Sequence, residues 1–322
     1  MDNSLAYIGY GMTATQKIPL LVITGPTAAG KTALALELGT RRDIEIISAD
    51  SRQVYRHMDI GTAKAGAEER ARVVHHCVDI VDPDEPFSVS DFTRLAQSAI
   101  EDIYRRQRLP VVVGGTGLYI RALTQGLAPL PGADETLRRQ WHVEERQEKG
   151  SLHARLSRID PRMAKGLHIN DVTRIIRALE VHALTGRTMS SWQDEHCFSE
   201  RPYNDIRLAV TFKRDHLYRR IEERVEQMFE HGLLDETGML LERGYAPELK
   251  SMRTIGYQEC IAHLRGEMSL SDAVTRIKRD SRRYAKRQLT WLRHEDEINW
   301  LEDPFDSGSI DEWADKLLCK CL

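Results

Sequence analysis

Short apolar runs alternate along this chain with segments of helical character. Leu20–Thr24 is a continuous apolar run that ends at a glycine, and Ile44–Ala49, Val111–Val113 and Ile206–Phe212 are three further strand candidates. Runs of this length, bounded by turn residues, are typical of strands buried on both faces of a parallel sheet. Ala33–Leu38, after the first run, is rich in helix formers. We therefore predict an α/β fold with a mostly parallel, doubly wound sheet.

The middle of the chain has a different pattern. Pro129–Gly132 is rich in turn residues. Beyond it, Asp134 can cap a helix over residues 135–149, and Asp171 can cap another over residues 173–184. We interpret this part as a helical insertion domain. The predicted organisation is a flexible leader (1–18), a P-loop core in two parts (19–129 and 205–322) and the insertion (130–204).

Two further helices are predicted in the second half of the chain, over residues 214–231 and 276–293. The latter combines many basic residues with Tyr284 and Trp291. Basic residues suit nucleic-acid phosphates and aromatic rings suit bases. A solvated helix face is the alternative interpretation of the same run.

Gly25–Thr32 carries the most specific motif. Its sequence, GPTAAGKT, matches G-x-x-x-x-G-K-[ST] between a predicted strand and a predicted helix. In such a loop, backbone N–H groups and the helix N-terminus hold phosphates. Lys31 adds a point charge, and Thr32 offers a hydroxyl ligand for Mg²⁺. Thr27 could contact a bridging oxygen or face solvent. The loop predicts a diphosphate- or triphosphate-bearing ligand, but not the chemistry performed on it.

Three weaker features accompany this loop. Asp50 follows the second predicted strand, so it should face the phosphate site as a general base or a group near Mg²⁺, unless it only closes a turn. Gly114–Gly117 either admits a ligand or makes a tight turn. Arg220 and Arg224 share a helix face, where they could clamp a diphosphate or pair with neighbouring glutamates.

Composition narrows the class of protein. The chain has 322 residues, 41% hydrophobic, and a net charge of −3, which disfavours indiscriminate polyanion binding. We find neither an apolar run long enough to span a bilayer nor a secretory signal, and five scattered cysteines favour a reducing cytoplasm. We expect a cytoplasmic monomer that does not bind membranes. Neither Cys319 and Cys321 nor His75–Cys77 has the spacing of a zinc site.

The motifs, taken in order, resemble the tRNA dimethylallyltransferase (tRNA isopentenyltransferase) family of bacterial type. The matching stretches are GPTAAGKT, SADSRQVYRHMDIGTAK, VVVGGTGLYIRAL, NDVTRIIRALEV, RIEERVEQM, TIGYQE and AKRQLTWLR, which span Gly25 to Arg293. The resemblance implies transfer of a dimethylallyl group from dimethylallyl diphosphate to N6 of the adenosine 3′-adjacent to the tRNA anticodon. It also implies Mg²⁺, a P-loop core with a helical insertion, and the tRNA anticodon stem-loop as partner.

The resemblance further implies roles for individual residues. Asp50 would be the general base, and Thr27, Lys31 and Arg224 would complete the catalytic set. The residues implied to bind the diphosphate are Gly25, Pro26, Thr27, Ala28, Ala29, Gly30, Lys31, Thr32 and Arg220, with Thr32 as the metal ligand. The residues implied to contact tRNA are Asp50, Ser51, Arg52, Gln53, Thr116, Arg138, Thr173, Arg174, Ile175, Ile176, Arg177, Arg253, Thr254, Ile255, Gly256, Tyr257, Gln258, Lys286, Arg287, Gln288, Leu289, Thr290, Trp291, Leu292 and Arg293.

The chain departs from the family pattern at one point in the insertion. Ile169 follows His168 where the family usually has proline, which should change only the entry to the next helix. The chain also lacks the zinc finger of eukaryotic relatives. Two other functions stay open: prenylation of a free adenine nucleotide, and a P-loop kinase or nucleotide-switched RNA-binding protein. The last is disfavoured because no apolar run ending in aspartate stands where a Walker B element is expected.

Overall fold

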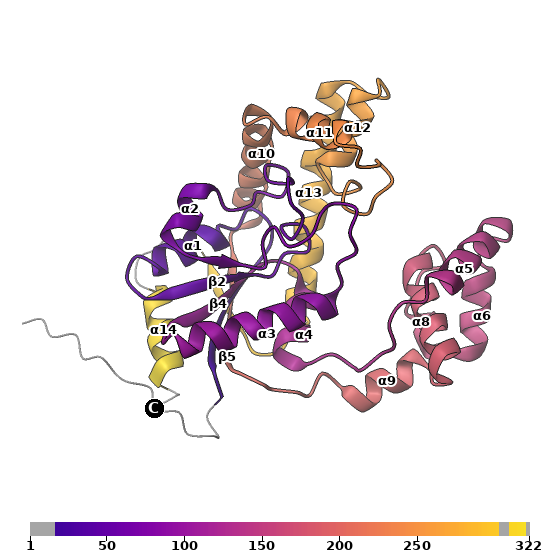
Figure 1. Cartoon of the computed structure of the whole chain (residues 1–322), viewed down its shortest axis with the longest axis horizontal. Helices are drawn as coiled ribbons and strands as arrows, with labels where there is room; N and C mark the ends of the chain where they lie inside the picture. Colours follow the sequence, from indigo (N-terminus) through magenta and orange to yellow (C-terminus); the bar gives the residue numbers. More distant parts are fainter. Residues whose placement is uncertain (1–16, 303–308, 320–322) are drawn as a thin grey trace, which may run out of the picture. The chain divides into compact units, whose positions relative to one another are not determined.

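A computed structural model describes residues 17–302 and 309–319, and its centre is a six-stranded sheet (Figure 1). The strand order is β3-β2-β4-β1-β5-β6, and all of its strand pairs are parallel. This confirms the predicted α/β fold. The predicted leader lies, up to residue 16, outside the described residues. The strands are β1 (Pro19–Thr24), β2 (Ile44–Ser48), β3 (His75–His76), β4 (Leu109–Val113), β5 (Asn204–Thr211) and β6 (Ile298–Glu302).

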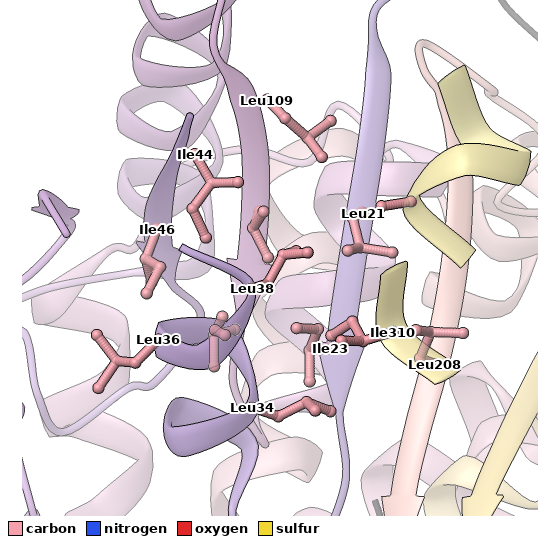
Figure 2. Close-up of a cluster of buried hydrophobic side chains, with 14 of the residues drawn as sticks. Leu21, Ile23, Leu34, Leu36, Leu38, Ile44, Ile46, Leu109, Leu208 and Ile310 are labelled. Carbon is pink, nitrogen blue, oxygen red and sulfur yellow. The ribbon is translucent and has the colours of Figure 1, made fainter. Parts of the chain in front are cut away.

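Both faces of the sheet are apolar because consecutive strand residues point to opposite sides. On one face, Leu21 and Ile23 of β1 pack with helices α1 (Lys31–Leu38) and α14 (Ser309–Cys319). Figure 2 shows Leu34, Leu36 and Leu38 of α1 gathered against the strands on this side. On the other face, Leu20 and Val22 belong to a second cluster, with α3 (Val89–Arg105) and α4 (Gly117–Gln125). The sheet is thereby buried between two helical layers.

A group of helices after β5 forms a third core. It contains α10 (Arg214–Glu230), α11 (Leu233–Glu242), α12 (Tyr257–Leu264) and α13 (Leu270–Leu292), seen together in Figure 1. Their apolar side chains pack on Val54, Tyr55 and Met58, in the connection between β2 and α2 (Ala67–Arg72). Helix α13 begins six residues before the predicted residue 276 because Ser269 caps it by accepting a hydrogen bond from the amide of Asp272.

Backbone contacts separate residues Gln125–Glu200 from the rest as a compact unit with its own apolar core. The predicted caps are confirmed: Asp134 accepts from the amides of Thr136 and Leu137, and Asp171 accepts from that of Arg174. The cap at Asp171 forms although Ile169 replaces the family's proline. The helices of this unit are α5 (Glu135–Gln147), α6 (Ser151–Ile159), α7 (Pro161–Lys165), α8 (Val172–Thr185) and α9 (Met189–His196).

Among the described residues, no helix is both long and apolar enough to cross a membrane. Cys77, Cys197, Cys260 and Cys319 are free thiols. His76, which is adjacent to Cys77, bonds the carboxylate of Glu45 with its Nε2 at 2.7 Å, so this histidine supports strand β2.

Candidate active site

The carboxyl ends of three neighbouring strands meet at one edge of the sheet. Strand β1 leads into the phosphate loop Gly25–Thr32, β4 into Gly114–Gly117, and β2 into Asp50. Backbone and side-chain hydrogen bonds join these segments: the amide of Gly114 donates to Ile23 (3.1 Å), and that of Ser51 donates to the hydroxyl of Thr116 (3.1 Å). In doubly wound sheets this edge is where ligands bind. The topology therefore brings together the three features that sequence placed separately.

A cavity of about 540 Å³ opens over the phosphate loop. Its floor is made by the loop and the first turn of α1, and its walls by the residues that follow β2 and β4 and by one side of α10. The residues most relevant to an anion are Thr27, Ala28, Gly30, Lys31, Thr32, Asp50, Gly114, Gly115, Arg220, Arg224 and Gln288. The geometry fits a diphosphate group.

A second cavity, of about 350 Å³, adjoins the first. One part of it is apolar, and four arginines line the rest. The residues common to both cavities are Thr27, Ala28, Asp50, Thr62, Arg224 and Tyr284. The apolar residues of the second cavity are Ile221, Val225, Met228, Ile255 and Ile277, and its arginines, besides the shared Arg224, are Arg52, Arg253 and Arg287.

Asp50 stands where the two cavities join. Its Oδ1 accepts hydrogen bonds from the amides of Arg52 (2.8 Å) and Gln53 (3.4 Å). The turn interpretation is confirmed, since these bonds fix the carboxylate, and its role toward a ligand stays a prediction. Within the described part of the chain both bonds use Oδ1, so Oδ2 is available to a ligand.

The cations of the site are held in a partly dehydrated environment. Burial, and then the neighbouring Arg224, lower the pKa of Lys31 to about 8, although Asp50 opposes the shift. Burial also lowers the pKa of Arg224, again against the effect of Asp50. Lys31 donates to the carbonyl of Pro26 at 2.8 Å. Because dehydration strengthens charge interactions, these groups are well suited to an anion that enters the cavity.

Arg220 is fixed against the phosphate loop. Its Nε donates to the carbonyl of Ala28 at 2.9 Å, and its guanidinium lies 4.8 Å from the centre of the Phe212 ring. Two of the three neighbouring glutamates have other partners: Glu222 bonds Arg282, and Glu226 bonds Lys278. The third, Glu223, lines the cavity together with the two arginines. The clamp on a diphosphate stays a prediction.

The residues implied to contact tRNA divide by exposure. Exposed side chains in the core unit are Arg253, Gln258, Lys286, Arg287, Thr290 and Arg293, and partly exposed ones are Ser51, Arg52, Gln53, Thr116, Thr254, Ile255, Leu289 and Trp291.

Apart from the half-buried Asp50, the other residues of this set in the core unit are buried, and their contact with tRNA stays a prediction. Tyr257 is fully buried and donates to Glu236 at 2.6 Å, Gly256 is buried beside it, and Leu292 is 5% exposed. Gln288, 8% exposed, is turned inward.

Burial separates the insertion residues in the same way. Thr173 and Arg174 are exposed, but Ile175 and Ile176 are packed in the core of their own unit, and their contact with tRNA stays a prediction. Arg138 and Arg177 both bond the buried Glu180, Arg138 through two nitrogens at 2.8 and 2.9 Å. Arg138 thereby holds α5 to α8, an ion-pair role that the sequence did not indicate. Arg177, which lies on α8 itself, also donates to the carbonyl of Pro131 at 2.7 Å.

Sequence reasoning missed several residues that shape the site. Thr62 lines both cavities, and Glu236 supports its loop by accepting from the amides of Asp59 (2.9 Å), Ile60 (2.8 Å) and Gly61 (3.1 Å). Thr62 lies within a stretch that resembles the family, so it could have been found. Nothing in the local pattern around Glu236 indicates a buried carboxylate.

The donor set at the phosphate loop fits Mg²⁺. Thr32 and Asp50 line the same cavity and offer oxygen atoms, which are the ligands Mg²⁺ prefers together with substrate phosphates and water. Among the described residues no group of three histidine, cysteine or acidic side chains could hold a metal alone. The site thus suits an ion that arrives with its phosphates.

The fold and the site together define a P-loop protein with one cavity over its phosphate loop and a second, arginine-lined cavity beside it. Family models agree with this class: IPP transferase matches residues 53–295, and isopentenyl transferase matches residues 18–75. The chain belongs to the IPP transferase family.

Relatives and solved structures are consistent with that family. The chain is 52% identical to a tRNA dimethylallyltransferase of Geobacter metallireducens over 92% of this chain and 97% of the relative. It is similar to the crystal structure of the tRNA isopentenylpyrophosphate transferase of Bacillus halodurans, with a TM-score of 0.70, 42% identity and coverage of 95% and 98%. A eukaryotic dimethylallyltransferase acting on tRNA matches with a TM-score of 0.79 and 29% identity, over 94% of this chain and 79% of that one.

Proposed function

We propose that this protein transfers a dimethylallyl group from dimethylallyl diphosphate to N6 of the adenosine 3′-adjacent to the anticodon in tRNA. The observation that carries the proposal is the junction of two cavities at Asp50, one suited to a diphosphate and the other to a base and its backbone. Similar proteins are named tRNA dimethylallyltransferase and dimethylallyltransferase acting on tRNA. The products are N6-(dimethylallyl)adenosine and diphosphate.

The phosphate loop holds the donor. The amides of the loop and Lys31 bind the diphosphate, and Thr32 would hold Mg²⁺, which neutralises charge on the phosphates when bound. The five-carbon chain then lies toward the apolar residues of the second cavity, such as Ile221 and Met228. This orientation places the reacting carbon near Asp50.

The proton and the leaving group have separate acceptors. As the C–O bond to the diphosphate breaks and the N6–C bond forms, the Oδ2 of Asp50 takes the proton from the exocyclic amine. The electron pair of the broken bond goes to the diphosphate. Lys31, Arg220 and Arg224 stabilise this charge where it develops.

The adenosine must leave the stack of the anticodon loop to reach Asp50. Arg52, Arg253 and Arg287 line the cavity through which it would arrive, and they suit the phosphates on either side of the base. We propose that the unit Gln125–Glu200 is an insertion domain that contacts the same tRNA through Thr173 and Arg174. We further propose that the protein works as a monomer in the cytoplasm.

The test is an assay of substrate choice. The enzyme is mixed with Mg²⁺, dimethylallyl diphosphate and, in separate arms, an unmodified tRNA with adenosine beside the anticodon, the same tRNA with guanosine there, or AMP, ADP or ATP. We expect a prenylated nucleoside only with the adenosine-bearing tRNA. Product from free nucleotides without tRNA would assign the nucleotide reaction instead, and ATP turnover without prenyl transfer would assign the kinase class.

A further inference from the structure

Helix α13 reaches the phosphate loop through one side chain. The Oε1 of Gln288 accepts a hydrogen bond from the amide of Thr27 at 2.9 Å, and its Nε2 donates to the carbonyl of Gly115 at 2.9 Å. Only 8% of Gln288 is exposed. A single amide group therefore bridges the loops that follow β1 and β4, and both of its polar atoms are satisfied.

The space around this amide is closely fitted. A Cβ atom at Gly115 would stand 2.2 Å from the Nε2 of Gln288, so only glycine admits the bridge. Trp291 follows one turn after Gln288 on α13, and a Cβ atom at Gly117 would stand 2.2 Å from its side chain. Helix α13 is thus seated on this loop at two points, three residues apart on one face of the helix.

The other face of the same turn is exposed. Lys286, Arg287 and Thr290 point outward, whereas Gln288 points to the loops. An RNA that docks on the outer face would not reach the inward amide. The resemblance to the family implied tRNA contact for the whole run, but the contacts of Gln288 are with the protein.

We propose that Gln288 is a positioning residue for the diphosphate: it fixes the amide of Thr27, and so the shape of the phosphate loop, against the loop after β4. The proposal rests on the proposed function for the identity of the donor. A loop held in its binding shape loses less conformational entropy when the anion binds. Gln288 therefore contributes to affinity for the donor without touching tRNA.

The test uses two variants that break the bridge from opposite ends. Gln288→Met keeps the length of the side chain but removes both hydrogen bonds, and Gly115→Ala displaces the amide while α13 keeps its sequence. For each we expect about tenfold weaker binding of inorganic diphosphate and a similar rise in the KM for dimethylallyl diphosphate. The Kd for tRNA and the KM for tRNA should stay within about twofold of the wild type. Gln97→Met, at an exposed position of α3, is the matched control, and thermal unfolding checks that all variants fold.

Three results would overturn the proposal. Weaker tRNA binding with unchanged diphosphate binding would make Gln288 an RNA contact. Unchanged or tighter diphosphate binding in both variants would remove its positioning role. Equal losses for both substrates would indicate general destabilisation. The two binding measurements do not depend on turnover. If the wild type failed to prenylate tRNA, the proposed function would be contradicted, but the comparison of diphosphate binding with tRNA binding would still test the role of Gln288.

Discussion

At the scale of single residues, the environment of each charge decides what it can do. Lys31 and Arg224 are dehydrated cations beside Asp50, and burial lowers the pKa of both. Elsewhere burial acts on a carboxylate in the opposite direction. It would raise the pKa of Glu45, but hydrogen bonds from Arg106, His76 and Arg108 lower it to about 2. The positive charges of Lys31 and Arg224 are thus available to a ligand. The negative charge of Glu45 is instead paired with side chains that support strand β2.

The lowered pKa of Lys31 predicts a pH dependence of anion binding. In the ligand-free protein Lys31 is protonated below pH 8 and loses its proton as the pH rises through about 8. Affinity for inorganic diphosphate, titrated between pH 6.5 and 9.5, should therefore fall above pH 8. Lys31→Met, which cannot titrate, should bind weakly at every pH and lack this transition. If the affinity of the wild type and of Lys31→Met changed with pH in the same way, Lys31 would not be the source of the pH dependence.

At the scale of elements, the segments with strong local patterns were predictable. Strand β1 and its loop were predicted because a buried parallel strand is a continuous apolar run and the loop has a fixed spacing. Strand β3 is only His75–His76, too short and polar to show a pattern, and β6 mixes apolar with polar residues near the sheet edge. Helix α13 was predicted too short because the basic run begins only at Arg276, whereas the helix already starts after its cap at Ser269.

The buried network at α11 and α12 predicts a stability effect. The hydroxyl of Tyr257 bonds Glu236, which in turn bonds three amides of the loop before Thr62. Tyr257→Phe should lower the free energy of unfolding by about 1–3 kcal/mol, because a buried carboxylate loses a donor. Urea denaturation measures the change. Tyr245→Phe, half-buried in the same cluster, should change it by less than about 0.5 kcal/mol. Equal changes in the free energy of unfolding for the two variants would mean that the hydrogen bond from the Tyr257 hydroxyl to Glu236 does not stabilise the fold.

At the scale of the whole molecule, the site depends on residues distant in sequence. The two cavities take residues from the phosphate loop, the end of β2, helix α10 and helix α13. Sequence patterns identified Asp50 and Arg224 separately, and the family resemblance implied that both act in the same reaction. The sequence could not predict which side chains of these motifs are buried. The motifs that resemble the family contain inward residues such as Tyr257 and Gln288 next to outward ones such as Arg253 and Arg287, and only packing distinguishes them.

The exposed face of α13 predicts how tRNA binds. Lys286→Ala combined with Arg287→Ala should weaken tRNA binding and lower the slope of log K against log salt by up to about 2, because each lost phosphate contact removes roughly one unit. Filter binding between 50 and 300 mM salt measures both. Arg105→Ala, an exposed position on α3, is the control and should leave the slope unchanged. An unchanged slope in the double variant would make the basic run a solvated face.

The central claim is that prenyl transfer takes place where the two cavities meet, with Asp50 as the base. A single-turnover experiment with Asp50→Asn, in which enzyme is saturated with donor and tRNA before Mg²⁺ starts the reaction, tests it most directly. Asparagine keeps the shape and the acceptor oxygen of the turn but cannot take the proton. We expect the rate of prenyl transfer to fall about 10²- to 10⁴-fold, while the Kd for tRNA and for inorganic diphosphate change by less than about threefold. A variant that transfers the prenyl group at the wild-type rate would contradict the account.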